Sequence, residues 1–501
     1  MPAVDSVAIV GGGSAAWLTA LSLSTYCPSL KLRLVRPKVG SPVGVGESTQ
    51  DDFTRLLHAS GLDLGELYGA CAATLKCGIY YTDWDAIGKH YWHPFADVSL
   101  GAPRPDFRAN HTVAHHYQQM ILRRPKKFSH DGYYAAVHCS YDTCVKKNLV
   151  APEAAVAFHI DALLLIQFLE RKLPRVEVIE SDSIEATIVD GQVAGLQLTE
   201  DRTLHADLYV DCTGFNRAVV GQISALTTLP YEANVNRAVA AGVPYLDGSQ
   251  EATPYTGAHA HEHGWTWKIP LKERFGTGYV YHDRFCDPEQ AELNFRKHWG
   301  EERMKDVRVA HIPFDSATLR QPWVKNVVAI GLSAGFVEPL EATGLNWVIT
   351  SATQLCRSIA ASYFDEDIAA KYNANLVGYV HDVHDFIDAH YKLSARRDSE
   401  FWRYQTSRPY PERLEHRLEL YQKEMPTSAN RIKTTPWAFH EVSWLDILNG
   451  YQFTYEQSKI DPAGGAAAEK ELRAIASRRR HGKPPLDCRP PERRTNPVRA
   501  S

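Results

Sequence analysis

The stretch of sequence that decides the fold is Ser6-Val7-Ala8-Ile9-Val10-Gly11-Gly12-Gly13-Ser14-Ala15-Ala16. A short apolar run, expected as a buried strand, leads directly into a glycine turn, and residues 17–24 follow with the pattern of a helix. The glycines allow a tight turn, and the helix N-terminus offers unpaired N–H groups to a pyrophosphate. The stretch therefore predicts a dinucleotide site. Its expected lining residues are Gly11, Gly13, Ser14, Ala15 and Ala16.

Strand-like runs that end in glycine recur along the chain. Residues 31–35 alternate as a second strand, which completes a βαβ unit. Residues 208–210 and 327–330 also read as strands, and they lead into Gly214 and Gly331. This spacing predicts an α/β fold in which one Rossmann-like cofactor domain is assembled from discontinuous segments.

The chain is expected to divide into three parts. Residues 1–350 form a discontinuous cofactor-binding core with an inserted sheet on the substrate side, including a helix at 161–170 and a strand pair at 185–199. Residues 351–461 form a mainly helical subdomain that covers the substrate. Residues 462–501 are rich in Arg, Ala and Pro without apolar periodicity, which predicts a basic, largely disordered tail.

The composition is that of an ordinary cytoplasmic enzyme. The chain has 501 residues and a formal net charge of -4, and 23% of its residues are charged, so nothing favours a nucleic-acid or membrane partner. The first ten residues contain no secretory signal, and no apolar run approaches the roughly eighteen residues of a membrane span. The 9 cysteines include no Cys-x-x-Cys, as expected for reduced thiols. The sequence leaves open whether the chain forms a homodimer.

Several histidines stand close together in the sequence, but none belongs to a ligand set of recognisable spacing. Such histidine-rich loops are typical of polar surface, and no metal site is predicted. The closely spaced histidines are His111, His115, His259, His261, His263, His381 and His384.

Residues 264–270 read Gly-Trp-Thr-Trp-Lys-Ile-Pro. The alternation places the indoles of Trp265 and Trp267 on one face of an extended segment. Pro270 has no N–H to donate to a sheet, so the segment is expected to end there or to lie at a sheet edge. By itself the pattern is typical of a buried aromatic pair in a strand.

Two further segments carry reactive side chains. Lys76 lies in an apolar run, where a lysine most often extends from a strand edge to water; a desolvated amine is either a neutral nucleophile or a hydrogen-bonding cation. Residues 338–344 read Glu-Pro-Leu-Glu-Ala-Thr-Gly. Two acids three apart suit a turn before a helix, and a carboxylate near a lysine can orient it and accept a proton.

Taken together, these segments resemble those of flavin-dependent halogenases of the tryptophan halogenase type. Trp-x-Trp-x-Ile-Pro is the hallmark of that family, and Trp265 and Trp267 are expected to lie beside the flavin and keep the organic substrate away from it. Lys76 matches the essential lysine of the family. Glu341 matches the glutamate that stabilises the arenium intermediate and accepts the ring proton.

The resemblance implies FAD as the cofactor, bound in a domain of the glutathione-reductase and aromatic-hydroxylase type. Residues 44–49 resemble the loop that runs alongside the flavin, and residues 211–215 resemble a second flavin-associated segment. Arg36 stands where an acidic residue usually holds the ribose, and by itself it would favour NADP. A single dinucleotide fingerprint implies that a separate NAD(P)H-dependent flavin reductase supplies FADH2. The further expected cofactor residues are Gly46, Glu47, Ser48, Thr49, Asp211 and Gly331.

The implied reaction uses reduced FAD, O2 and bromide or chloride to make hypohalous acid, which passes to Lys76 and halogenates an electron-rich arene. Thr343 and Gly344 match the family's halide-binding backbone. His93 and Phe95 match ring faces that enclose the substrate. The region around Trp444 does not align with the family's amino-acid-binding block, so indole or an indole derivative is predicted in place of free tryptophan.

Two other interpretations share the same cofactor motif. A flavin-dependent aromatic monooxygenase fits the glycine turn equally well, but it does not account for the Trp-x-Trp-x-Ile-Pro segment together with Lys76. A catalytically idle flavoprotein is consistent with weak FAD retention at Arg36. The halogenase is the favoured prediction.

Overall fold

The computed structural model describes residues 4–38, 46–76, 78–94, 157–253, 255–361, 366–423, 426 and 438–454. The predicted tail at 462–501, Phe95, His111 and His115 lie outside these residues. Within the described ranges, no helix is long and apolar enough to cross a membrane.

The predicted βαβ unit forms the start of a sheet that brings distant segments together. β1 (Ser6–Val10) pairs in parallel with β2 (Lys31–Arg36) on one side and with β12 (Leu208–Asp211) on the other. α1 (Ser14–Tyr26) connects the first two strands. Among the described residues this sheet has six strands, in the order β18 (Trp323–Val324), β19 (Val327–Ala329), β12, β1, β2 and β8 (Glu177–Glu180). The predicted assembly from discontinuous segments is confirmed.

A second, largely antiparallel sheet carries the tryptophan segment. Its seven described strands are, in spatial order, β17 (Ala310–Pro313), β13 (Arg237–Pro244), β16 (Arg274–Tyr281), β15 (Gly264–Pro270), β14 (Thr256–Ala260), β5 (Gly78–Thr82) and β6 (His90–Pro94). A small sheet links β3 (Glu47–Ser48), β7 (Ala157–Ile160) and β4 (Thr74–Lys76). Another consists of β11 (Arg202–Leu204), β10 (Gln192–Thr199) and β9 (Glu185–Val189), which confirms the predicted strand pair.

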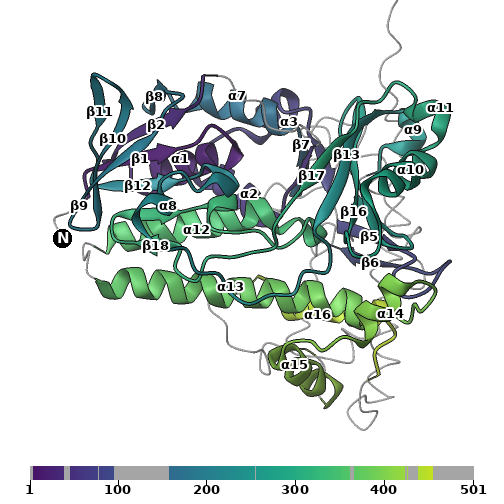
Figure 1. Cartoon of the computed structure of the whole chain (residues 1–501). Coiled ribbons are helices and arrows are strands. Elements are labelled where there is room, and N and C mark those ends of the chain that lie inside the picture. The colour runs from purple at the N-terminus through teal and green to yellow at the C-terminus, as the bar shows by residue number, and fades with distance from the viewer. Residues whose placement is uncertain are drawn as a thin grey trace, which may run out of the picture.

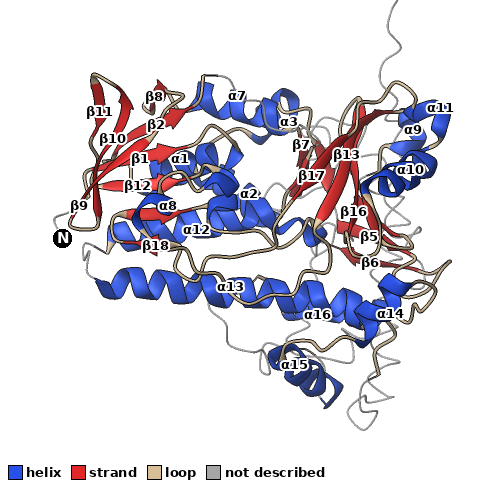
Figure 2. Cartoon of the chain, in the orientation of Figure 1, coloured by secondary structure: helices blue, strands red, loops and turns tan. Residues whose placement is uncertain are grey.

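The helices lie around and between the sheets (Figure 2). Figure 1 shows the 27-residue helix α13 running beneath both sheets, with α14 and α16 near its C-terminal end. The helical character predicted for 355–425 and the helix predicted at 161–170 are confirmed. Beside α1, the described helices are α2 (Asp51–Ala59), α3 (Leu64–Ala70), α7 (Ala162–Lys172), α8 (Val220–Ile223), α9 (Gly248–Glu251), α10 (Pro288–Trp299), α11 (Glu301–Met304), α12 (Thr343–Ala360), α13 (Glu366–Lys392), α14 (Glu400–Ser407), α15 (Glu412–Lys423) and α16 (Glu441–Gly450).

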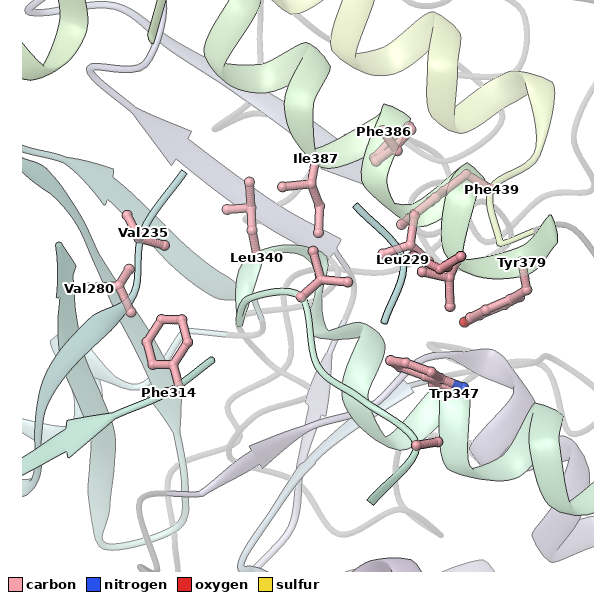
Figure 3. Close-up of a cluster of buried hydrophobic side chains, with 14 of the residues drawn as sticks. Leu229, Val235, Val280, Phe314, Leu340, Trp347, Tyr379, Phe386, Ile387 and Phe439 are labelled. Atoms are coloured by element: carbon pink, nitrogen blue, oxygen red, sulfur yellow. The ribbon is translucent and has the colours of Figure 1, made fainter. Parts of the chain in front are cut away.

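One hydrophobic core joins the two larger sheets to the C-terminal helices. Figure 3 shows part of it, where Val280 of β16, Trp347 of α12 and Phe386 of α13 all contribute buried side chains. Leu340, from the predicted turn at 338–344, is buried in this same core. The turn is therefore fixed by apolar packing between the sheets and α13.

The tryptophan segment is an interior strand. β15 pairs with β14 on one side and with β16 on the other, and Pro270 is its last residue. The expectation that the segment ends at Pro270 is confirmed, and the alternative of a sheet edge was wrong, because β15 has a paired strand on each side. Gly278 of β16 is the cross-strand partner of Trp267, and a Cβ at this glycine would lie 2.1 Å from the indole ring.

Gly278→Ala is therefore expected to destabilise the protein by roughly 1–3 kcal/mol, because the added methyl group displaces the Trp267 indole. Denaturant unfolding, monitored by tryptophan fluorescence, measures this loss. Gly257→Ala is the matched control in the same sheet, because a Cβ there would make only ordinary contact, 3.5 Å from Lys268. Equal stabilities for the two variants would contradict the proposed close packing.

Candidate active site

The glycine turn after β1 has the geometry that a pyrophosphate requires. Gly11 has a φ of 138°, and a Cβ there would lie 2.4 Å from the carbonyl oxygen of Cys212, so only glycine fits. Gly13 is the N-cap of α1, and no described side chain caps that helix end. No described atom lies within 4 Å of a Cβ built at Gly13. Ser14, Ala15 and Ala16 form the first turn of α1. Ala16 donates its N–H to the Gly13 carbonyl at 3.1 Å, so the N–H groups of Ser14 and Ala15 are the ones that suit a bound phosphate.

The two other strand-to-glycine segments support this turn. Asp211 is fully buried, and its carboxylate accepts hydrogen bonds from the N–H groups of Val219 and Val220, at 2.9 Å each. The same carboxylate accepts the Ser333 hydroxyl at 3.0 Å. A Cβ at Gly331 would lie 2.9 Å from that of Ala15. Asp211 therefore organises the loops around the predicted site, and these loops bring Gly331 against α1.

Arg36 is neutralised by neighbouring acids. Its guanidinium donates to Glu170 at 3.0 Å and to Glu180 at 3.2 Å. By itself, Arg36 would favour a ribose 2′-phosphate. Because two carboxylates already neutralise its guanidinium, its presence does not require such a phosphate.

The segment from Gly46 to Gln50 connects the cofactor domain with the second sheet. Gly46 has a φ of 83° and would place a Cβ 3.3 Å from Ile269 of β15. The Ser48 hydroxyl lies 3.0 Å from that of Thr256. Thr49 is held on β7, since its hydroxyl donates to the Phe158 carbonyl at 3.0 Å and accepts the Phe158 N–H at 2.8 Å. Burial raises the pKa of Glu47 to about 7.

Lys76 is completely buried at the end of β4. Its ammonium donates to the carbonyl oxygen of Thr49 at 2.9 Å. Burial lowers the pKa of the amine to about 7, against the opposing effect of the Glu341 carboxylate. With this pKa about half of the amine is a neutral nucleophile at pH 7, whereas an exposed lysine is almost fully protonated there.

Glu341 occupies a strained turn before α12. Its φ is 65°, and the following residue, Ala342, has a φ of 55°, so two successive residues with side chains are left-handed. The carboxylate is buried and accepts hydrogen bonds from Nδ1 of His93 at 2.9 Å and from the hydroxyl of Tyr81. Nε2 of His390 lies 3.5 Å from the same carboxylate.

These partners keep the buried carboxylate ionised. Burial alone raises the pKa of Glu341, but His93 and His390 outweigh that effect and hold the pKa below its ordinary value. Burial lowers the pKa of His93, whereas the Glu341 charge raises it, and the net direction is upward. Burial also lowers the pKa of His390, and the nearby Glu341 carboxylate offsets only part of that effect. The sequence patterns missed Tyr81 and His390, since no local signal links them to Glu341.

The first glutamate of the same turn supports the tryptophan strand. Glu338 accepts the Tyr391 hydroxyl at 2.8 Å, and Tyr391 in turn accepts the indole N–H of Trp265 at 3.1 Å. Burial raises the pKa of Glu338 to about 8, so this acid is mostly neutral at pH 7. Asn234 completes the group with a donor 3.4 Å from the carboxyl. The turn thus carries one ionised and one neutral acid, three residues apart.

Helix α12 begins at Thr343, two residues after Glu341. Thr343 and Gly344 form its first turn, and among the described residues no side chain caps that end and the first turn contains no acid. No described atom lies within 4 Å of a Cβ built at Gly344. Exposed N–H groups at the positive end of an 18-residue helix are suited to an anion.

The predicted substrate residues have different surroundings. The His93 ring is buried between Glu341 and Phe386, whose ring centroid lies 5.7 Å away. Trp444 is 1% exposed, with the Arg417 guanidinium 4.7 Å from its ring. The structure therefore brings His93 to the carboxylate and buries Trp444 beneath Phe386, while Phe95 lies outside the described residues. The assignment of His93, Phe95 and Trp444 to the substrate site stays a prediction.

The histidine groups form no metal centre in the described part of the chain. No group of three or more His, Cys, Asp or Glu side chains there can hold a metal ion. His259 and His261 instead stack on each other, with ring centroids 4.7 Å apart, and His298 lies across both rings.

This combination of a dinucleotide turn, a buried lysine and an ionised glutamate beside a tryptophan strand defines the enzyme class of flavin-dependent halogenases. The family profile "Tryptophan halogenase" matches residues 6–468, and the chain belongs to that family. The family uses flavin, acts on aromatic substrates and implies a flavin reductase as a partner. The predicted family, the enzyme class and the α/β fold are thereby confirmed.

Individual relatives agree along nearly the whole chain. The tryptophan 6-halogenase SttH of Streptomyces toxytricini is 30% identical over 95% of both sequences, and its crystal structure superposes with a TM-score of 0.81 over 95% of this chain and 96% of that one. The tryptophan 7-halogenase RebH of Lentzea aerocolonigenes is 28% identical over 85% of this chain and 83% of its own length. BrvH, a flavin-dependent halogenase from Brevundimonas sp. BAL3, is 29% identical with a TM-score of 0.78, over 97% of this chain and 98% of that chain.

The buried amine makes stability depend on pH. Below pH 7, Lys76 is protonated in both the folded and the unfolded chain, so the full cost of burying its charge is present. Between pH 7 and the ordinary pKa of 10.5, only the unfolded chain holds the proton, and the cost declines as the pH rises.

Lys76→Met is therefore expected to stabilise the protein at pH 6.5, by at most about 5 kcal/mol, with a gain that shrinks toward pH 10. Urea unfolding of both proteins at the two pH values measures the gain. A constant difference between pH 6.5 and pH 10 would show that Lys76 keeps an ordinary pKa in the folded protein.

Proposed function

We propose that this enzyme halogenates an indole or an indole derivative, with reduced FAD, O2 and bromide or chloride as co-substrates. The observation that carries the proposal is the completely buried Lys76 amine, with a pKa of about 7, within the field of the ionised Glu341 carboxylate. A structural lysine would gain nothing from this placement, because the burial of its charge destabilises the fold.

The residues around the glycine turn fit FAD. Its pyrophosphate would lie at the N-terminus of α1 beside Gly11 and Gly13, and its ring system beside the loop from Gly46 to Thr49 and the tryptophan strand. When bound, reduced FAD would supply the two electrons that reduce one oxygen atom of O2 to water, while the other oxygen atom oxidises the halide to hypohalous acid. The uncapped first turn of α12, at Thr343 and Gly344, would hold the halide.

Lys76 then transfers the halogen. Its neutral amine attacks the halogen atom of hypohalous acid, an N–X bond forms, the O–X bond breaks, and hydroxide leaves as water with the amine proton. The arene attacks the same halogen atom, the bonding pair of the N–X bond returns to nitrogen, and this nitrogen takes up a proton from water, which regenerates the neutral amine; the ring proton released afterwards neutralises the hydroxide. Glu341, held by His93 and Tyr81, stabilises the cationic arene and accepts the ring proton.

The choice of an indole rests on flat aromatic surfaces close to the carboxylate. His93 lies against Phe386, and Phe386 stacks on Phe439 with ring centroids 3.7 Å apart. Aromatic side chains this close to the carboxylate favour a planar aromatic substrate and require no charged group on it. The relatives include enzymes named for tryptophan and one named only as a flavin-dependent halogenase, at similar identity.

The reaction is tested by incubating the enzyme with a flavin reductase, FAD, NADH, O2 and a panel of indoles, each with bromide or chloride. Mass spectrometry is expected to show a halogenated indole that disappears with Lys76→Ala. Lys268→Ala is the matched control and should stay within about threefold of the parent. This lysine is half-buried and its pKa is also lowered, to about 8, but it donates to the main-chain carbonyl oxygen of Glu251. An oxygenated product without halogen, or full activity in Lys76→Ala, would overturn the proposal.

The two acids of the turn should respond differently to the same substitution. Glu341→Gln removes the charge that stabilises the arene, and a loss of at least about 100-fold in kcat is expected. Glu338→Gln replaces an acid that is already neutral at pH 7, so kcat should stay within about threefold. Steady-state halogenation rates at pH 7 measure both, with melting temperatures as the check on folding. Equal losses would contradict the assigned charge states.

A further inference from the structure

We propose that Gln50 is a positioning residue that holds Glu341 in its catalytic conformation. The side-chain amide of Gln50 donates a hydrogen bond to the main-chain carbonyl oxygen of Glu341 at 2.9 Å, in a buried environment. The proposal rests on the proposed function, in which Glu341 is the catalytic carboxylate.

The turn that carries Glu341 needs an external support. Glu341 and Ala342 both have left-handed backbones, with φ values of 65° and 55°, and residues with a Cβ adopt this conformation only when their surroundings enforce it. Leu340 anchors the turn in the core on one side. The Gln50 amide bonds to the carbonyl group between the two strained residues, where it opposes rotation of that peptide unit.

Gln50 has no competing task in its own helix. It is the N-cap residue of α2, yet its side chain makes no capping hydrogen bond among the described residues. An amide side chain at this position is 9% exposed and reaches across to a segment 291 positions away in the sequence. Loss of the amide therefore removes the bond to Glu341 without uncapping α2.

The same backbone segment supports the other half of the catalytic pair. The carbonyl oxygen of Thr49, the residue before Gln50, accepts the Lys76 ammonium at 2.9 Å. Thr49 is itself fixed on β7 through Phe158. Two adjacent residues thus place Lys76 and Glu341 relative to each other, one through its main chain and the other through its side chain.

The first test uses Gln50→Met, which keeps the length of the side chain and removes the donor. Crystal structures of the parent and the variant are expected to differ at the Glu341–Ala342 peptide unit, with ψ of Glu341 changing, φ of Ala342 leaving the left-handed region and the Glu341 carboxylate moving away from His93. This readout needs no activity, so it stays informative even if the parent enzyme yields no halogenated product. An unchanged Glu341 backbone and carboxylate in Gln50→Met would overturn the proposal.

Kinetics provide the second test. Gln50→Met should lower kcat about tenfold and change the KM for the arene less than twofold. Adding Ala342→Gly should recover part of the loss, because glycine adopts the left-handed conformation without strain. Asn326→Leu is the matched control: it removes a buried amide that donates to the Val193 carbonyl, and it should lower stability with kcat unchanged. A higher KM with an unchanged kcat, or no recovery of kcat with Ala342→Gly, would contradict the proposal that Gln50 positions Glu341.

A third variant gives a pH signature. In Gln50→Glu the protonated carboxyl can donate to the Glu341 carbonyl, whereas the ionised form cannot. The ratio of its kcat to that of the parent should therefore fall as the pH rises through the pKa of the new acid, and Gln50→Met should show no such trend. A flat ratio for Gln50→Glu between pH 5 and pH 9 would contradict a hydrogen bond that acts in catalysis.

Discussion

The central constraint on this molecule is that one carboxylate must stay ionised inside the protein. Glu341 is 2% exposed, and the burial of a charge costs several kcal/mol unless donors replace the water. His93 and Tyr81 supply these donors from β6 and β5, and His390 approaches from α13. The second sheet and the long helix must therefore pack against the same turn, and their shared core enforces that contact.

Two features of this site destabilise the fold while they serve the proposed chemistry. Lys76 is held without exposure to water, and its pKa of about 7 is the consequence of that burial. Glu341 and Ala342 adopt left-handed backbones, which cost roughly 1–2 kcal/mol each for residues with a Cβ. The apolar packing of Leu340 and the bond from Gln50 offset part of this strain. The amine and the carboxylate thus lie close enough for the Glu341 charge to raise the pKa of Lys76, in a region that local preferences alone would not assemble.

The tryptophan strand and the reactive turn form one unit. Trp265 donates to Tyr391, Tyr391 donates to Glu338, and Glu338 lies three residues before Glu341. Because the turn is shared, the surface expected beside the flavin and the carboxylate expected beside the substrate have a fixed separation. A fixed separation suits a reaction in which an oxidised halogen must pass from one side of the site to the other.

The sequence by itself determined the cofactor fold and the reaction type. The glycine turn at residues 11–16 needs a particular backbone, and the Trp-x-Trp segment and Lys76 belong to a family pattern. Only the tertiary structure decided that β15 is an interior strand, that Glu341 is ionised while Glu338 is neutral, and that Tyr81, His390 and Gln50 contact the turn. The reason is physical: pKa values and turn strain depend on neighbours that are between about 50 and 290 residues apart in the chain, and no local period or spacing encodes those contacts.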